Sequence, residues 1–132
     1  MIEFIIDTSA YSMAQRGDQK IIALLNKAQQ IYLPRIVEGE LKAGFSFGKQ
    51  KIENERLLEK FVASDSVTIL TLSEKTPDHF AQIYANLRSR GKPIGQNDLW
   101  IAALSLEINV PLLTLDSDFG SVNGLVLVNS GT

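Results

Sequence analysis

Short runs of apolar, largely β-branched residues alternate with longer segments of helical periodicity along the whole chain. The runs are IEFII at 2–6, IYL at 31–33, SVTIL at 66–70, VPLLTL at 110–115 and LVLV at 125–128. Strands this short and this apolar are typical of parallel sheets, which helices bury on both faces. The alternation therefore predicts a three-layer α/β fold around a central, mainly parallel sheet of four to five strands.

The intervening segments carry ordinary helix start and stop signals. A short helix or turn is expected after residue 7, closing at Gly17, and helices are expected over 18–30, 34–48, 51–63, 76–90 and 97–108. Asp18 is a suitable N-cap, Pro34 suits a helix start, and Thr76-Pro77 reads as an N-cap followed by the first helical residue. The chain has 132 residues and contains neither a linker nor a repeat, so a single domain over 1–132 is expected.

The composition excludes several kinds of site. The chain has no cysteine, which rules out disulfides, thiolate metal sites and a thiol nucleophile. A formal net charge of −2 argues against a surface that binds nucleic acid everywhere, although neutralising four acids would reverse its sign. The N-terminal apolar run is too short for a signal peptide and contains an acid, so a soluble, cytoplasmic protein with no membrane segment is expected.

Carboxylates stand where the predicted strands end. Asp7 follows the first strand directly, Asp116 and Asp118 follow the fourth, and Asp98 opens the helix that leads into the fourth. In doubly wound folds, ligands gather beyond the carboxyl ends of the strands, where the strand order reverses. These acids converge if the first and fourth strands are neighbours, and Glu40, on the helix after the second strand, could reach the same cleft.

Each acid also has a local explanation. Asp7 could cap a helix or form a turn, Asp98 could stabilise a helix dipole, and the acids at 116 and 118 could be turn residues. Glu40 is most simply a solvated helix position, and Glu38 competes with it from another face of the same helix. Taken singly, these structural explanations are the simpler ones.

The joint arrangement favours a metal site. Several carboxylates in one place repel one another, and either raised pKa values or a bound divalent cation relieves the repulsion. An all-oxygen ligand set suits Mg²⁺ or Mn²⁺ rather than Zn²⁺. Such ions activate water and stabilise the oxygens of an in-line phosphoryl displacement, so phosphodiester hydrolysis is the leading prediction.

Four motifs in this order carry a family resemblance. They are DTSAYS, the EL of VEGELKAG, PIGQNDLWIAALSL and LLTLDSDF. Together they resemble the PIN domain and, within it, the VapC-type ribonuclease toxins of prokaryotic toxin–antitoxin pairs. The similarity covers nearly the whole chain and is most specific from about residue 91 to 128.

The resemblance implies a set of site residues. The family's metal-binding acidic quartet falls on Asp7, Glu40, Asp98 and Asp116, with Asp118 as a fifth candidate because either of the last two acids could be the ligand. The EL motif favours Glu40 over Glu38. A hydroxyl that helps to hold metal-bound water falls on Ser9 or Thr114.

The resemblance also implies a mechanism and partners. One or two Mg²⁺ or Mn²⁺ ions would activate a water that attacks a phosphate of single-stranded or loop RNA, leaving a 5′-phosphate. A homodimer is implied, together with a VapB-like antitoxin whose C-terminal segment wraps the toxin and blocks or distorts the site.

Rival functions fit less well. The chain lacks the paired acids that a receiver-like phosphoacceptor domain has after its first strand, where only Asp7 stands. A haloacid-dehalogenase-like phosphatase would need an acid where Ser9 stands. A PIN-fold RNA-processing nuclease, or a PIN-fold RNA- or protein-binding module that is not a toxin, remains the alternative. His79 reads as a surface or cap residue, and Trp100 as a core or partner contact. The basic residues read as solvated helix faces in preference to phosphate contacts; they are Lys42, Lys49, Lys51, Arg56 and Lys60, and Arg88, Arg90 and Lys92.

Overall fold

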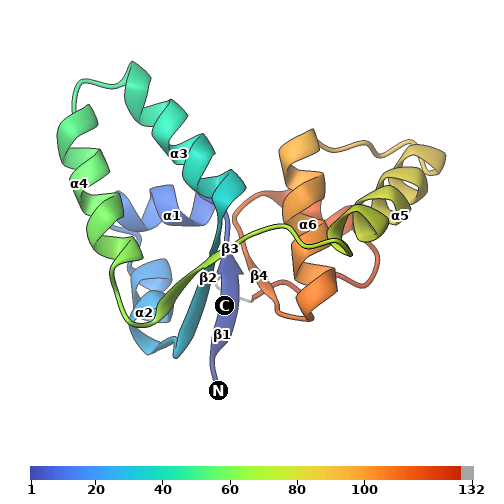
Figure 1. Cartoon of the computed structure of the whole chain (residues 1–132), viewed down its shortest axis with the longest axis horizontal. Coiled ribbons are helices and arrows are strands. Elements are labelled where there is room, and N and C mark those ends of the chain that lie inside the picture. Colours follow the sequence, from blue (N-terminus) through green and yellow to red (C-terminus); the bar gives the residue numbers. More distant parts are fainter. Residues whose placement is uncertain (129–132) are drawn as a thin grey trace.

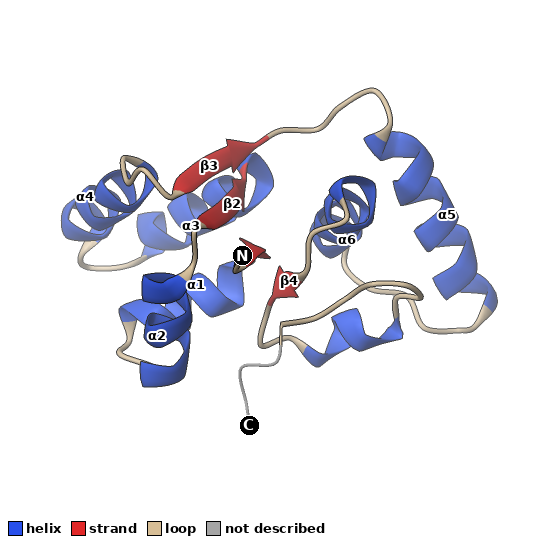
Figure 2. Cartoon of the chain, turned by 90° about the horizontal axis from the view of Figure 1, so that it is seen from below, coloured by secondary structure: helices blue, strands red, loops and turns tan. Residues whose placement is uncertain are grey.

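Residues 1–128, which the computed structural model describes, form a sheet of parallel strands with helices on both sides (Figures 1 and 2). The strands are β1 (Glu3–Ile6), β2 (Gln30–Pro34), β3 (Val67–Leu70) and β4 (Leu112–Leu113). Their order in the sheet is β3-β2-β1-β4. The predicted α/β fold with a parallel sheet is confirmed.

The helices divide between the two faces of the sheet. They are α1 (Thr8–Gln15), α2 (Gln19–Lys27), α3 (Arg35–Phe47), α4 (Lys51–Val62), α5 (Thr76–Ser89) and α6 (Gln96–Ile108), followed by the 3-10 helix η1 (Ser117–Ser121). Figure 1 shows α1 to α4 on one side of the strands, with α5 and α6 on the other. Because both faces are covered, the short apolar strands are buried from both sides.

Two local predictions were wrong in detail. Thr76 is the first residue of α5 rather than its N-cap, because its hydroxyl accepts a hydrogen bond from the Ser73 N–H (2.8 Å) and donates one to Glu107. The expected strand at 125–128 is reduced to a single parallel bridge between Leu127 and Leu112. Asp18 caps α2 as predicted, by accepting from the Ile21 N–H.

The strand order reverses between β1 and β4. From β1 the chain builds outward to β2 and then β3, and it then crosses back so that β4 pairs with the free side of β1. The Ile5 N–H donates to the Pro111 carbonyl (2.9 Å) and the Asp7 N–H to the Leu113 carbonyl (3.2 Å). In folds of this kind, the crevice at such a reversal is where ligands bind.

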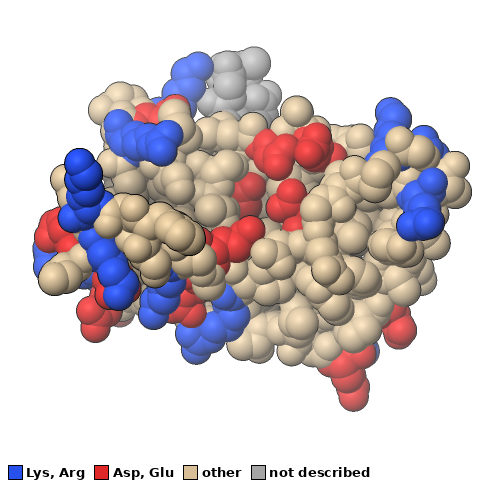
Figure 3. All heavy atoms as spheres, turned by 90° about the horizontal axis from the view of Figure 1, so that it is seen from above, with Lys and Arg blue, Asp and Glu red and all other residues tan. Residues whose placement is uncertain are grey.

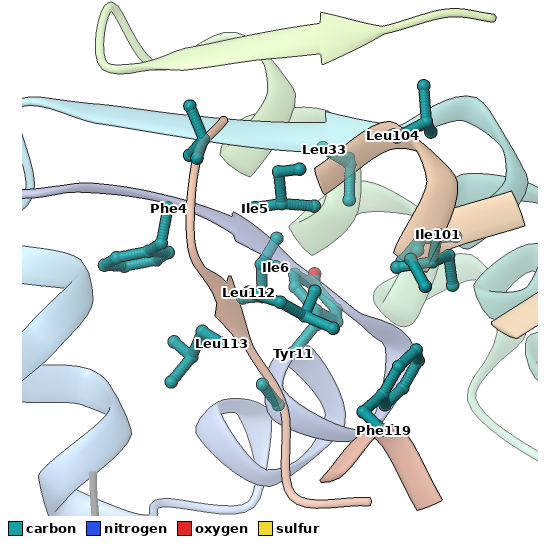
Figure 4. Packing of buried hydrophobic residues seen from close by; sticks show 14 of the residues in the cluster. Phe4, Ile5, Ile6, Tyr11, Leu33, Ile101, Leu104, Leu112, Leu113 and Phe119 are labelled. Atoms are coloured by element: carbon teal, nitrogen blue, oxygen red, sulfur yellow. The ribbon is translucent and has the colours of Figure 1, made fainter. Parts of the chain in front are cut away.

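The core gathers apolar side chains of β1, β2 and β4 with those of the helices that cover the sheet, α1 and α6 among them (Figure 4). Helix α6 is unusual because the consecutive residues Ile101, Ala102, Ala103 and Leu104 are all buried. Such a run of consecutive buried residues places this part of α6 inside the molecule, where Ile101 and Leu104 lie among core residues of the strands (Figure 4) and α5 packs against the helix. Within residues 1–128, no helix is long and apolar enough to cross a membrane.

The pairing of β4 with its neighbours predicts a large loss of stability on truncation. Leu112 is fully buried between β1 and the bridge at Leu127, so Leu112→Ala leaves a cavity that the sheet backbone cannot close. We expect the free energy of unfolding in urea to fall by about 3 kcal/mol.

Leu72→Ala is the matched control, because Leu72 is 45% exposed in the loop after β3. It should change the free energy of unfolding by less than about 0.5 kcal/mol. Equal effects of the two substitutions would contradict the assignment of β4 to the core.

Candidate functional site

Acidic side chains gather in a hollow at the carboxyl ends of the strands. Figure 3, which looks onto that edge of the sheet, shows Asp and Glu in the middle of the hollow and Lys and Arg on its flanks. A cavity of about 320 Å³ opens there, lined by Asp7, Thr8, Ser9, Ser12, Glu40, Asp98, Ile101 and Asp116. The four acids named from the sequence therefore share one cavity.

Asp7 is the most deeply buried of these acids, with 4% of its surface exposed. It caps α1, and its Oδ1 accepts from the Ala10 N–H (2.9 Å) and the Ser9 hydroxyl (2.8 Å), while its Oδ2 accepts from the Thr114 hydroxyl. Burial raises the pKa of Asp7 above its ordinary value, and these hydrogen bonds only partly oppose the rise. The negative charge of Asp116 adds to it.

Ser9 and Thr114 join the first turn of α1 to the loop after β4. The Leu115 N–H donates to the Ser9 hydroxyl and the Asp116 N–H to the Thr114 hydroxyl, each at 3.0 Å. Both hydroxyls predicted to support the site thus donate to the carboxylate of Asp7, and each also accepts from a backbone N–H of the loop after β4. Their geometry fixes where the carboxylate of Asp7 points.

Glu40 reaches the cavity from α3. Its Oε1 accepts from the Thr8 hydroxyl (2.7 Å) and its Oε2 from the Asn97 side-chain amide (3.3 Å). Glu38, the competing candidate, instead pairs with Arg35 at 2.7 Å and does not line this cavity. The choice between the two glutamates in the sequence therefore falls on Glu40.

Asp98 lies in the first turn of α6, half-buried at the side of the cavity. Its pKa is raised to about 6, first by burial and then by the negative charges of Asp116, Glu40, Asp7 and Asp118. The N-terminal end of a helix favours a carboxylate, but here burial and like charges outweigh that preference. The acids are therefore close enough to repel one another.

Asp116 and Asp118 separate in the structure. Asp116 is half-buried, lines the cavity and caps η1 by accepting from the Asp118 N–H (2.9 Å). Asp118 is exposed and is absent from the cavity lining, although its charge contributes to the raised pKa of Asp98. Asp116 is thus the better placed of the two, and Asp118 lies at the rim.

The donor set suits a hard divalent cation. Within residues 1–128, no group of three or more acidic or histidine side chains has the arrangement that holds a metal ion. The cavity nevertheless offers carboxylate and hydroxyl oxygens without nitrogen or sulfur ligands, which matches Mg²⁺ or Mn²⁺. After burial, the negative charges of the neighbouring acids raise the pKa of Asp98, and such an ion would relieve this repulsion.

Sequence reasoning missed Thr8, Ser12 and Asn97 as parts of the site. Thr8 and Asn97 hold Glu40, and Ser12 lines the cavity one helical turn after Thr8. The spacing of 8 and 12 on one helix face, and the position of Asn97 beside Asp98, were the available signals.

Other residues weighed from the sequence lie elsewhere. Trp100 stacks on Phe80 with ring centroids 4.0 Å apart, which makes it a packing residue between α5 and α6. Arg56 pairs with Glu53 on the exposed surface of α4, as expected for a solvated helix face.

A family model described as the PIN domain matches residues 4–125. Ribonuclease VapC1 of Haemophilus influenzae (strain R2866) is 31% identical over 116 residues, covering 84% of this chain and 84% of that protein. Ribonuclease VapC2 of Rickettsia felis is 29% identical over 131 residues, covering 96% of each.

Solved structures agree with these relatives. The crystal structure of VapBC2 from Rickettsia felis, bound to a DNA fragment from their promoter, matches with a TM-score of 0.82 and 28% identity over 96% of this chain and 97% of that one. VapBC-1 from nontypeable Haemophilus influenzae matches the fold with a TM-score of 0.86 at 24% identity, covering 98% and 99%.

The raised pKa of Asp98 predicts how pH affects the metal-free protein. The folded chain holds the Asp98 proton more tightly than the unfolded chain does, so wild-type stability is lost as pH rises from about 4 through about 6. Asp98→Asn removes this charge. In EDTA we expect it to be more stable than the wild type by about 1–2 kcal/mol near pH 8, allowing for the partial exposure of the group, with the smallest difference near pH 4.

Urea unfolding at both pH values measures this difference. Asp65→Asn removes an exposed acid outside the cavity and controls for the change in net charge. A difference between Asp98→Asn and the wild type that is the same at both pH values would contradict the account.

Proposed function

Because the chain belongs to the PIN-domain family, and within it to the VapC ribonuclease toxins of VapBC toxin–antitoxin systems, we propose that it is an Mg²⁺- or Mn²⁺-dependent endoribonuclease. It hydrolyses phosphodiester bonds of single-stranded or loop RNA at the acidic cleft and leaves a 5′-phosphate. The observation that carries the proposal is the single cavity lined by Asp7, Glu40, Asp98 and Asp116. These acids come from four separate segments of the chain.

The four acids are the ligands of the cation in this proposal. A divalent cation held there supplies Lewis acidity, which makes water a stronger nucleophile near neutral pH and stabilises charge on the phosphate. Asp98, with a pKa of about 6, is mostly ionised at pH 7 even without the cation and so is available as a ligand.

The surrounding side chains orient these ligands. Ser9 and Thr114 fix the two oxygens of Asp7, and Thr8 and Asn97 fix those of Glu40. Hydrogen bonds of this kind hold a carboxylate in its binding orientation before the ion arrives, which reduces the reorganisation needed on binding. The acids themselves keep the phosphate out until a cation neutralises them, since like charges repel.

The partners follow from the relatives. A VapB-like antitoxin neutralises the toxin in this proposal, which the solved VapBC structures with the same fold support. The chain acts in the cytoplasm as a homodimer, with RNA as its substrate.

Cleavage of RNA by paired variants tests the assignment of the site. Glu40→Gln and Asp98→Asn should lower metal-dependent cleavage of mixed cellular RNA by about 100-fold or more, because each removes a charged ligand. Glu38→Gln is the matched control, since Glu38 pairs with Arg35 outside the cavity, and it should cleave like the wild type.

The assay uses purified protein freed of any copurified partner, with Mg²⁺ or Mn²⁺ and with EDTA, and circular dichroism checks that every variant is folded. Cleavage that persists in EDTA, or that survives Glu40→Gln, would contradict the proposed site. A folded, metal-loaded wild type that cleaves no RNA would favour the binding-module alternative.

Thermal unfolding tests metal binding without activity. Because an ion that binds only the folded chain stabilises it by mass action, Mg²⁺ at millimolar concentration should raise the Tm of the wild type by about 3 °C or more. Asp98→Asn should lose most of that rise, and Glu38→Gln should keep it. Equal rises in all three proteins would show that the ion binds elsewhere.

A further inference from the structure

A second pocket, of about 370 Å³, lies beside the acidic cleft between α1, α3 and α4. We call it the α1–α3–α4 pocket. It shares Thr8, Ser12 and Glu40 with the cleft, so the two hollows adjoin along the first turns of α1. Figure 1 shows these three helices together on one side of the sheet. A chain that leaves the cleft along α1 therefore passes this pocket.

The walls of the pocket combine flat apolar surface with amide groups. Phe45 supplies an aromatic ring and Leu57 supplies aliphatic surface, and the buried Tyr11 also lines the pocket. Gln15 and Asn54 supply side-chain amides, each with donors and an acceptor. An aromatic or aliphatic wall with amides at its edge is the chemistry that holds an unstacked nucleobase and reads its hydrogen-bonding edge.

The hydroxyl of Tyr11 is the second observation that points to a ligand. Tyr11 is 1% exposed, its ring packs edge-on against Phe61 (5.2 Å between centroids), and it belongs to the core shown in Figure 4. Within residues 1–128, its hydroxyl is buried without a hydrogen-bond partner, and burial raises its pKa to about 12. A buried phenol hydroxyl is normally hydrogen-bonded, because leaving it unpaired costs free energy.

We propose that the α1–α3–α4 pocket binds one nucleobase of the RNA, next to the phosphate in the cleft, and so sets the base preference of cleavage. The proposal rests on the proposed ribonuclease function, because that function places the RNA backbone at the shared wall. Gln15 and Asn54 read the edge of the base, Phe45 lies against the ring, and the Tyr11 hydroxyl gains its missing partner. Arg16, at the end of α1, supplies a positive charge beside the pocket for the next phosphate.

A binding experiment that needs no cleavage tests the pocket directly. Adenosine, guanosine, cytidine and uridine are titrated separately into the isotope-labelled protein in EDTA, and the side-chain amide signals of Gln15 and Asn54 are followed by NMR. We expect one nucleoside to shift both signals far more than the other three. Asn54→Leu keeps the size but removes the amide, and in this variant the Gln15 amide signal should no longer shift with any nucleoside.

Cleavage of a randomised single-stranded RNA library tests the consequence. Asn54→Leu and Tyr11→Phe should change the preferred base at one position beside the cut and reduce discrimination there by about tenfold, as expected for losing a hydrogen bond to a base edge. Tyr84→Phe is the matched control, because Tyr84 is 46% exposed on α5, and it should preserve the wild-type preference. Tyr11→Phe should fold normally, since it deletes an unpaired buried hydroxyl.

The outcomes separate this inference from the proposed function. Equal shifts for all four nucleosides, or an unchanged base preference in both variants, would overturn the base pocket while leaving the nuclease intact. Variants that weaken binding of a VapB-like peptide but leave base preference unchanged would make the pocket a protein-binding site and would equally overturn the inference. If the wild type cleaves no RNA, base-selective shifts lost in Asn54→Leu would still support the pocket, although the proposed nuclease would have failed.

Discussion

The parallel pairing of β1 with β4 is the constraint on which the site depends. It brings Asp7 next to Thr114, 107 positions later in the chain, and the hydrogen bond between their side chains ties the two strand ends together. Without this pairing, the acids after β1 and β4 would be unrelated turn residues. With it, the reversal of strand order creates a crevice whose two walls each end in a carboxylate.

Burial and charge oppose each other at this crevice. The apolar strands and the buried middle of helix α6 stabilise the fold, and the same packing carries Asp7 and Asp98 into an environment that disfavours their ionisation. Hydrogen bonds from Ser9 and Thr114 compensate Asp7 in part, and Asp98 keeps a pKa of about 6. A divalent cation resolves this conflict in the proposed function. The free energy sacrificed in the metal-free protein is then recovered when the ion binds.

The sequence alone predicted the fold class and most elements, because short apolar runs and helix caps are local signals. It also singled out the acids that line the cavity, since the carboxyl ends of parallel strands lie at the same edge of the sheet. The family resemblance favoured Glu40 over Glu38, although local pattern alone left both open because the difference depends on an ion pair with Arg35. The sequence could not decide between Asp116 and Asp118, because that choice depends on the turn of η1. It overestimated the strand at 125–128, where only one bridge forms beside a two-residue β4. The sequence did not predict the α1–α3–α4 pocket, since its walls come from three helices whose packing no local pattern specifies.

In the proposed function, the acids at the β1–β4 reversal form one divalent-cation site. Crystals of the metal-free protein soaked in Mn²⁺ test it most directly, because anomalous scattering locates the ion without reference to activity. We expect strong anomalous density in the cleft, within about 2–2.5 Å of carboxylate oxygens of Asp7, Glu40, Asp98 and Asp116. Ordered crystals with an accessible cleft and no density there at saturating Mn²⁺, or with density only at surface acids such as Asp65, would contradict it.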